Sequence, residues 1–427
     1  MRRDSFDSEI APWLRLAQAP GIGALSAARL LAVLQTPQCV FGQSEAALAE
    51  LLGSHRKAQA LLAQPASLGR YLDQVFAWLN APPATAGRND AIVHAVLSLH
   101  DVRYPPALRE TDDPPPVLYA LGAEAWLHGP EPSHERPPAA PALLPWHQCS
   151  RAMLAIVGSR SPTPQGLRNA QDMAAQLQAM RICIVSGLAR GIDAAAHRGA
   201  LQTASPAGCA GATHPATVAV LGTGVDRIYP AAHAELAVQI ARQGLILSEQ
   251  PLGTAPLAAN FPRRNRIITG ISQGTLVVEA AEKSGSLISA RLAAEQGREV
   301  MAIPGSIHAP QSRGCHALIK QGAKLVETVS DVLEELPLRR LPMANTPVVP
   351  SEAPSAANPP AAQASPSARP GESPLLQAMG FDPVSLDTLC ARTGEDARVL
   401  QAQLLELEML EMVARLPGGW FQRIGQA

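Results

Sequence analysis

The sequence has no strong excess of charge and few aromatic side chains. Its 427 residues carry a formal net charge of −1, with 17% charged and only 4% aromatic residues. A chromatin-type protein binds DNA through a strongly basic surface, which this composition excludes. Any affinity for nucleic acid must therefore come from a local basic patch. Since 47% of the residues are hydrophobic, the chain is globular, and its length allows roughly two to four domains.

Cysteine pairs and long apolar segments are also missing. The six cysteines are scattered, and none forms a CxxC pair or a Cys/His spacing typical of zinc ligands. We therefore expect reduced thiols and no bound metal. No apolar run reaches the roughly 18 residues that span a bilayer, and the first residues contain no apolar signal core. These absences predict a cytoplasmic protein without a membrane segment.

The distribution of proline, alanine and apolar residues divides the chain into four regions. Residues 8–80 show apolar side chains at helical spacing and predict a helical domain. Residues 90–337 alternate short β-branched runs with helical segments and predict an α/β domain. Residues 338–374 are dominated by Pro, Ala and Ser, which predicts a linker. Residues 375–424 form a last compact unit.

The strands expected in residues 90–337 are near-continuous apolar runs, which are typical of a parallel sheet covered by helices on both faces. The predicted fold class is therefore α/β, with a Rossmann-like, doubly wound and mostly parallel sheet. The expected strands are 95–99, 117–121, 153–157, 182–186, 217–221, 245–248, 275–278, 299–303 and 324–326. Two Pro- and Ala-rich segments, 128–150 and 203–216, interrupt this domain, and we expect surface loops there.

The N-terminal helical region contains the turn Pro20-Gly21-Ile22-Gly23 between two predicted helices. This turn is similar to that of a helix-hairpin-helix, or SAM-like, domain. In such a turn glycines bring backbone N–H groups close to a DNA phosphate at a helix N-terminus. An ordinary turn between two packed helices explains the same residues equally well, so both interpretations stay open.

The C-terminal region predicts a winged helix. Its expected elements are helices at 375–379, 384–393 and 396–411, then a β-hairpin at 412–424 with a Gly turn. The third helix carries Glu406, Glu408 and Glu411 against Arg398. Since acidic side chains repel phosphate, a protein contact competes with DNA binding as the role of this unit.

The first loop that could bind a ligand follows the expected strand at 153–157. It reads Gly158-Ser159-Arg160, with Thr163 positioned to cap the next helix. A helix N-terminus beyond the carboxyl end of a parallel strand is the usual position for an anion. Gly158 permits close approach, Ser159 offers a hydroxyl, and the forked guanidinium of Arg160 suits phosphate. The GxGxxG pattern is missing, so no dinucleotide cofactor is indicated.

The second loop repeats the pattern of a strand, a Gly loop and a helix. Ser186, Gly187 and Arg190 are candidate contacts to the same ligand. Asp193 and His197 lie four residues apart on the next helix, a spacing that allows an acid–base pair. A helix cap beside a structural histidine explains these two residues without catalysis, and we expect this simpler arrangement.

A third segment concentrates positive charge in a chain of modest charge. It consists of Phe261, Pro262, Arg263, Arg264, Asn265 and Arg266. Basic groups beside an aromatic face suit a single-stranded phosphate backbone with stacked bases. Ion pairs from these arginines to Glu249 or Glu279 are the competing interpretation.

The fourth loop contains Lys283, Ser284, Gly285 and Ser286 ahead of another expected helix. Its small polar residues predict a second anion-binding helix N-terminus, with the lysine alongside. Because parallel strands end at the same edge of a sheet, we expect all four loops to converge on one binding site. No residue among them is predicted to be catalytic.

Read together, these motifs resemble the DNA-processing protein A family (DprA/Smf). The matching segments are RYPPALRETDDPPPVLYALG at 103–122, AIVGSR at 155–160, IVSGLARGIDAAAH at 184–197, VAVLGTGVDRIYP at 218–230, SEQP at 248–251, FPRRNRIITG at 261–270, VVEAAEKSGSLISA at 277–290 and AIPG at 302–305. The resemblance covers roughly residues 90–330, and the helical and winged-helix regions also fit a three-domain member.

The resemblance implies a fold and a function. Such proteins dimerise through the Rossmann-like domain and bind single-stranded DNA with little sequence preference. They protect incoming DNA during natural transformation in competent bacteria and help load the RecA recombinase, without chemical turnover or a cofactor. Arg160 and the arginines after Phe261 are then the best DNA contacts, with Lys283 and Ser284 in second rank. One departure is Cys315, which follows Gly314 where the family usually has Thr or Ser and then Asn.

Two other functions compete with this one. Related Rossmann-like enzymes hydrolyse nucleoside monophosphates and carry a PGGxGTxxE-type motif with a catalytic Glu. The nearest segment here is Gln273-Gly274-Thr275 with Glu279, which lacks the Gly pair. The second alternative, regulation through duplex DNA bound by the winged helix, is weakened by the acidic third helix.

Overall fold

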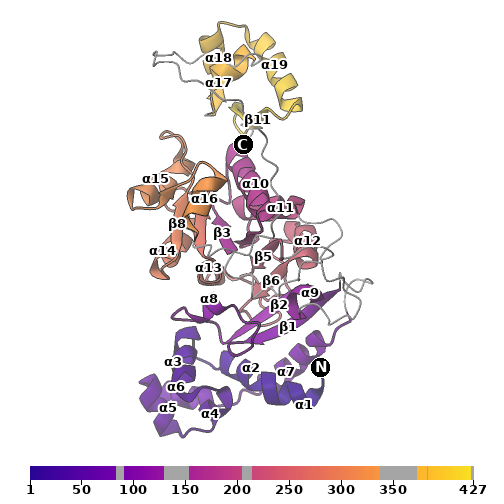
Figure 1. Ribbon diagram of the computed structural model, residues 1–427, viewed down its shortest axis with the longest axis vertical. Helices are drawn as coiled ribbons and strands as arrows, with labels where there is room; N and C mark the ends of the chain where they lie inside the picture. Colours follow the sequence, from indigo (N-terminus) through magenta and orange to yellow (C-terminus); the bar gives the residue numbers. More distant parts are fainter. Residues whose placement is uncertain (83–90, 129–152, 204–213, 337–372, 382, 425–427) are drawn as a thin grey trace, which may run out of the picture. The chain divides into compact units, whose positions relative to one another are not determined.

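The computed structural model describes residues 1–82, 91–128, 153–203, 214–336, 373–381 and 383–424 (Figure 1). The described chain divides into two compact units, residues 1–337 and 338–427. Most of the two predicted insertions and nearly all of the predicted linker lie outside the described residues. No helix in the described ranges is long and apolar enough to cross a membrane.

Nine strands of the first unit form one sheet in the order β1-β2-β6-β5-β4-β3-β7-β8-β9. The strands are β1 (Ile92–Ser98), β2 (Val117–Ala123), β3 (Met153–Val157), β4 (Cys183–Ser186), β5 (Thr217–Val220), β6 (Leu245–Ser248), β7 (Gly274–Val277), β8 (Glu299–Ala302) and β9 (Lys324–Leu325). All neighbouring pairs from β6 to β9 are parallel, whereas β1 and β2 are antiparallel at one edge. The predicted Rossmann-like, mostly parallel sheet is confirmed.

The strand order reverses at β3, which lies between β4 and β7. Strands β3, β4, β5, β6 and β7 are buried along their whole length, as expected for apolar strands covered on both faces. Ligands of doubly wound sheets bind outside the carboxyl ends of the strands at such a reversal. The topology therefore directs attention to the loops after β3 and β7.

Helices cover the two faces of this sheet (Figure 1). Helices α10, α11 and α12 pack in a row, and α13 packs against α14. The helices are α8 (Pro106–Arg109), α9 (Glu124–His128), α10 (Pro164–Ala179), α11 (Ile192–Thr203), α12 (Ala234–Gln243), α13 (Asn260–Gly270), α14 (Ser286–Glu295), α15 (Arg313–Lys320) and α16 (Val329–Glu335). Thr163 caps α10 as predicted, because its hydroxyl accepts a hydrogen bond from the Gly166 N–H.

The N-terminal region is helical, as predicted, and shares a hydrophobic cluster with the sheet. Its helices are α1 (Arg3–Ser5), a π-helical turn (Phe6–Ile10), α2 (Ala11–Ala17), α3 (Ala24–Leu34), α4 (Pro37–Phe41), α5 (Glu45–Leu52), α6 (His55–Leu62) and α7 (Ser67–Leu79). Trp78 of α7 stacks on His94 of β1, with ring centroids 4.5 Å apart. The Pro20–Gly23 turn joins α2 to α3, and Gly21 adopts a φ of 75° that favours glycine.

The second unit has the winged-helix order and its own hydrophobic cluster. Its elements are α17 (Pro374–Met379), β10 (Val384–Ser385), α18 (Leu386–Thr393), α19 (Ala397–Met409), β11 (Val413–Leu416) and β12 (Trp420–Arg423). The predicted second helix started two residues too early. Val384 and Ser385 pair with β12 as a short strand, so the helix begins only at Leu386.

Candidate nucleic-acid interface

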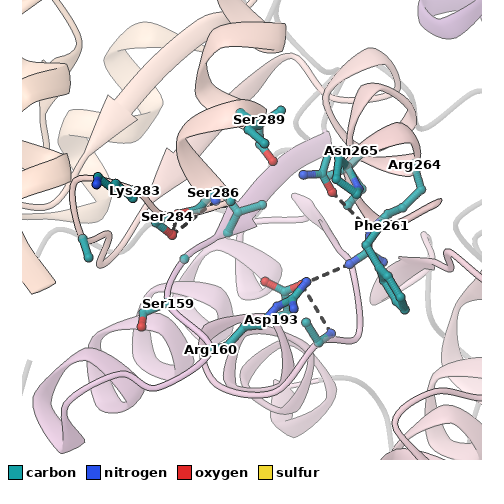
Figure 2. A pocket seen from close by; sticks show the side chains of 18 of the residues that line it. Ser159, Arg160, Asp193, Phe261, Arg264, Asn265, Lys283, Ser284, Ser286 and Ser289 are labelled. Atoms are coloured by element: carbon teal, nitrogen blue, oxygen red, sulfur yellow. Dashed lines mark hydrogen bonds and ion pairs between the residues drawn. The ribbon is translucent and has the colours of Figure 1, made fainter. Parts of the chain in front are cut away.

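The loops after β3 and β7 open into one cavity of about 450 Å³ at the point where the strand order reverses. The cavity is lined by Val157, Gly158, Ser159, Arg160, Ser161, Ala189, Asp193, Phe261, Pro262, Arg264, Asn265, Ile268, Ala281, Lys283, Ser284, Gly285, Ser286, Ile288 and Ser289. Figure 2 shows Lys283 and Ser284 on one side and Phe261 and Arg264 on the other. Residues from all four predicted segments therefore meet as expected, and the third of these segments lies on α13.

The β3–α10 loop presents an exposed cation beside an aromatic ring. The Ser159 N–H donates to the Glu279 carbonyl at 2.7 Å, which ties this loop to the end of β7. Arg160 is exposed, and its guanidinium carbon lies 5.8 Å from the centroid of the Phe261 ring. A guanidinium over an aromatic face is attracted to the ring and keeps donors free for an anion.

Glu279 holds this loop through hydrogen bonds from Thr163. Its two carboxylate oxygens accept from the Thr163 N–H at 2.9 Å and from the Thr163 hydroxyl at 2.5 Å. Burial raises the pKa of Glu279, although the two hydrogen bonds from Thr163 oppose the shift. The alternative of an arginine ion pair with Glu279 is wrong, since its carboxylate holds the N-cap of α10 instead.

The β7–α14 loop brings a second cation and a helix N-terminus to the cavity. Helix α14 begins at Ser286 directly after Gly285. The Ser284 and Ser286 hydroxyls lie 2.7 Å apart, and Lys283 beside them is exposed. Backbone N–H groups of a first helical turn attract negative charge, so this loop fits the predicted anion-binding position.

Arg264 occupies a different position from the one expected for a phosphate contact. Its side chain is buried, with 4% of the residue exposed. The guanidinium donates to the carbonyl oxygens of Gly187 and Val220, and it lies 3.8 Å from the Asp193 carboxylate (Figure 2). Burial lowers the pKa of Arg264 to about 10, and Asp193 opposes this shift. The expectation of an open guanidinium at Arg264 is corrected, because its donors already hold neighbouring loops together.

Gly187 is required by this arrangement. A Cβ atom there would lie 2.2 Å from a guanidinium nitrogen of Arg264, so only glycine leaves room. Ser186 is buried, and its hydroxyl donates to the Ile156 carbonyl at 2.6 Å. Both residues belong to the scaffold beneath the cavity rather than to its surface, which corrects their prediction as direct contacts.

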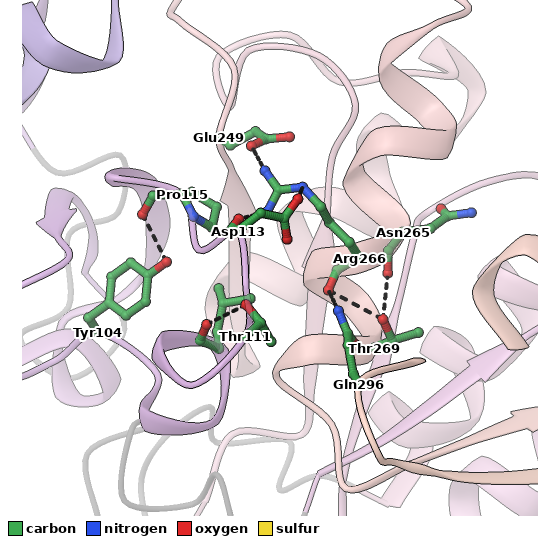
Figure 3. A network of polar contacts seen from close by, with 10 residues as sticks. Tyr104, Thr111, Asp113, Pro115, Glu249, Asn265, Arg266, Thr269 and Gln296 are labelled. Carbon is green, nitrogen blue, oxygen red and sulfur yellow. Dashed lines mark hydrogen bonds and ion pairs between the residues drawn. The ribbon is translucent and has the colours of Figure 1, made fainter. Parts of the chain in front are cut away.

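Arg266 is also held by ion pairs (Figure 3). Its guanidinium pairs with the Glu249 carboxylate and lies 3.3 Å from the Asp113 carboxylate. It also donates to the Asp113 carbonyl at 2.6 Å. Burial raises the pKa of Glu249, and Arg266 opposes this shift. The alternative of pairing with Glu249 is correct for this arginine, so Arg266 anchors the loop before β2 instead of facing the cavity.

The other predicted contacts fall into two groups. Asn265 lines the cavity and accepts from the Arg264 Nε at 3.2 Å. Arg190 and Arg263 are exposed but lie outside the cavity lining. These two cations therefore remain available to a ligand that extends beyond the cavity.

One aromatic residue was missed by the sequence analysis. The Tyr229 ring lies 5.5 Å from the Phe261 ring at an interplanar angle of 48°, and 47% of the residue is exposed. The signal was present in the segment VAVLGTGVDRIYP, where an aromatic residue follows a strand whose end lies at the same edge of the sheet. The sequence alone does not show that the Tyr229 ring contacts Phe261 of α13, because this contact depends on the fold.

Asp193 and His197 have separate roles. Asp193 accepts from the Ala189 N–H at 3.3 Å and pairs with Arg264. His197 is buried, with its Nδ1 atom 2.7 Å from the Thr217 hydroxyl oxygen. Because that hydroxyl donates to the Ile184 carbonyl, Nδ1 is the donor and the histidine is structural. In the described part of the chain, no group of three or more His, Cys, Asp or Glu residues is arranged to hold a metal ion.

A doubly wound sheet with a cavity at its strand reversal defines a Rossmann-like protein. Basic side chains and a helix N-terminus at this position fit an anionic ligand. Residues 144–337 match the family described as DNA recombination-mediator protein A, and residues 359–419 match the DprA winged helix domain. The chain belongs to the DprA/Smf family of DNA recombination mediators.

Individual relatives support this assignment. The chain is 37% identical to Protein Smf of Escherichia coli (strain K12), covering 86% of this chain and 83% of the relative. It is 33% identical to Protein Smf of Synechocystis sp., covering 98% and 99%. The X-ray structure of DNA processing protein A from Streptococcus pneumoniae matches with a TM-score of 0.58 and 31% identity, covering 76% of this chain and 98% of that one.

Proposed function

We propose that this chain binds single-stranded DNA in the cavity between β3, β7 and α13, protects it during natural transformation and passes it to RecA without chemical turnover. One observation carries the binding proposal: Arg160, Lys283, the N-terminus of α14 and the Phe261 ring all open into the same space. On the resemblance to the family, the proposal extends to RecA as a partner, a homodimeric assembly and a cytoplasmic location.

The chemistry of the cavity favours a single strand over a duplex. Its volume of about 450 Å³ lies within the roughly 300–1,000 Å³ typical of ligand pockets, so it receives a short piece of a strand. Lys283 and Arg160 supply charge for the phosphates, while Phe261 offers a face for a base. A duplex keeps its bases stacked inside and cannot use this ring. Arg190 and Arg263 are exposed and directly follow the lining residues Ala189 and Pro262, which supports them as contacts to neighbouring nucleotides.

The carboxylates near the cavity support binding without turnover. Both oxygens of Glu279, the residue nearest to a catalytic Glu in the sequence, accept hydrogen bonds from Thr163. Asp193 lines the cavity but is paired with the buried Arg264. Incubation with nucleoside monophosphates tests this point: release of free base at enzymatic rates would replace the proposal with a hydrolase.

The first test is fluorescence anisotropy of a labelled single-stranded oligonucleotide at two salt concentrations, with duplex of the same sequence as competitor. We expect salt-sensitive binding that duplex does not displace. Each phosphate contact contributes about −0.7 to the slope of log K against log salt for single strands. Arg160→Gln should therefore weaken binding and reduce the slope by about 0.7.

The matched control is Arg291→Gln, which removes an exposed cation of α14 outside the cavity. It should leave the affinity and the slope unchanged. If Arg160→Gln and Arg291→Gln behave alike in a folded protein, the DNA site lies elsewhere on the chain.

A further inference from the structure

Helix α19 of the winged-helix unit is apolar on two opposite faces. Its inner face supplies Leu400, Leu404 and Leu407, which are buried in the cluster of this unit. These positions are spaced four and three residues apart, as expected for one side of a helix. The burial of this side is how α19 stabilises the second unit.

The outer face carries an apolar stripe of Val399, Ala402, Leu405 and Met409, all of them exposed. Leu405 is 60% exposed and Met409 is 80% exposed. At roughly 100° per residue, Leu405 and Met409 lie about opposite the buried leucines. Single exposed apolar residues are ordinary, but a stripe along three turns of one helix marks an interaction surface.

The charge around the stripe argues against DNA as its partner. Between residues 395 and 411 the only basic residue is Arg398, whereas the acidic residues are Glu395, Asp396, Glu406, Glu408 and Glu411. In a DNA-binding winged helix this third helix enters the groove and faces phosphates, which an acidic surface repels. An anionic lipid surface is disfavoured for the same reason.

We propose that the outer face of α19 docks a basic amphipathic helix of another protein. Leu405 and Met409, one turn apart, fit between apolar side chains spaced three and four residues apart on a partner helix. Lysine or arginine beside those side chains complements Glu406, which is exposed on α19. A second copy of α19 brings the same acidic residues and is repelled. This proposal concerns the second unit and does not rest on DNA binding by the first.

The test uses the full-length protein and a fluorescent helical peptide of leucine and lysine, with leucines three and four residues apart. The same peptide with glutamate in place of lysine is its control. We expect the lysine peptide to bind and the glutamate peptide not to bind. The double variant Leu405→Gln with Met409→Gln should weaken binding about tenfold or more, as for central apolar contacts of an interface.

The matched control variant is Val33→Gln with Leu257→Gln, which changes two exposed apolar residues of the first unit. It should alter peptide affinity by less than about twofold. Glu406→Gln should weaken peptide binding and reduce its salt dependence. All substituted side chains are largely solvent-facing, and thermal unfolding of each variant checks that the fold is kept.

Three results would overturn the proposal. The glutamate peptide binds as tightly as the lysine peptide, or the stripe variant and the control variant lose equal affinity. Alternatively, sedimentation shows that the stripe variant abolishes self-association, which would make the partner a second copy. Single-stranded DNA affinity of the stripe variant should stay at the wild-type value, so a failure here is distinguishable from a failure of the DNA proposal.

Discussion

Adjacent residues Arg263 and Arg264 have opposite environments. Arg263 is exposed, whereas Arg264 is buried against the carbonyls of Gly187 and Val220 and beside Asp193. A run of arginines in a sequence shows only that positive charge is concentrated there. Which guanidinium faces the ligand depends on carbonyl and carboxylate groups supplied by distant segments. The two arginines therefore call for different tests.

Arg264→Gln should destabilise the folded protein by about 3–5 kcal/mol, because it leaves the buried Asp193 carboxylate without its cation. Arg263→Gln should change the free energy of unfolding by less than about 0.5 kcal/mol. Urea unfolding of both variants measures the difference as a shift of the midpoint at constant slope. Similar midpoints for the two variants would contradict the assignment of Arg264 as a buried residue that holds neighbouring loops together.

His197 should make stability depend on pH in an acidic window. Burial lowers the pKa of His197 to about 3, while an unfolded histidine titrates near 6.5. As pH falls below about 6.5, the unfolded state gains a proton that the folded state does not. Stability is therefore lost towards pH 3, at up to about 1.4 kcal/mol per pH unit.

The variant His197→Gln isolates this contribution from the carboxylates, which titrate in the same range. Glutamine lacks the titration, so the stability advantage of wild type over variant should shrink as pH is lowered from about 7 to about 5. Denaturant unfolding at several pH values measures it. A constant difference across this range would mean that His197 is already hydrated or protonated in the folded protein.

At the scale of elements, the strands and the convergence of their loops follow from the sequence. Near-continuous apolar runs identified the central strands, and parallel pairing brings their carboxyl ends to one edge. The start of α18 did not follow, because pairing of Val384 and Ser385 with β12 is a tertiary contact. The ion pairs of Arg266 could not be predicted for the same reason, because its partners Glu249 and Asp113 lie in other parts of the chain.

Two elements also combine to form the aromatic platform. Phe261 comes from α13 and Tyr229 from the segment that follows β5. Phe261→Ala should cost about 1–3 kcal/mol of single-stranded DNA affinity, as for one stacked base. Tyr229→Ala should lose less, since its ring supports Phe261 from outside the cavity lining. Anisotropy titrations measure both variants.

The control for the platform is Tyr229→Phe, which keeps the ring and removes only the hydroxyl. It should bind like wild type, because the contact to Phe261 is between rings. If Tyr229→Phe and Tyr229→Ala lose the same affinity, the hydroxyl rather than the ring acts on DNA, and the platform model is wrong.

At the scale of the whole molecule, a net charge of −1 conceals two surfaces of opposite character. The cavity of the first unit gathers Arg160 and Lys283 at a helix N-terminus. In the second unit, α19 is flanked mainly by acidic residues. Local fields act over about a Debye length, roughly 10 Å at moderate salt, so the average charge decides neither interaction.

This separation predicts the behaviour of a chain that ends at Pro337. All cavity-lining residues lie between Val157 and Ser289, and the first unit has its own hydrophobic cluster. The shortened protein should keep its single-stranded DNA affinity within about twofold, under about 0.5 kcal/mol, and lose binding of the leucine–lysine peptide. Anisotropy with both probes measures the two effects on one preparation. A tenfold loss of DNA affinity in a folded, shortened chain would show that the winged-helix unit supplies part of the DNA site.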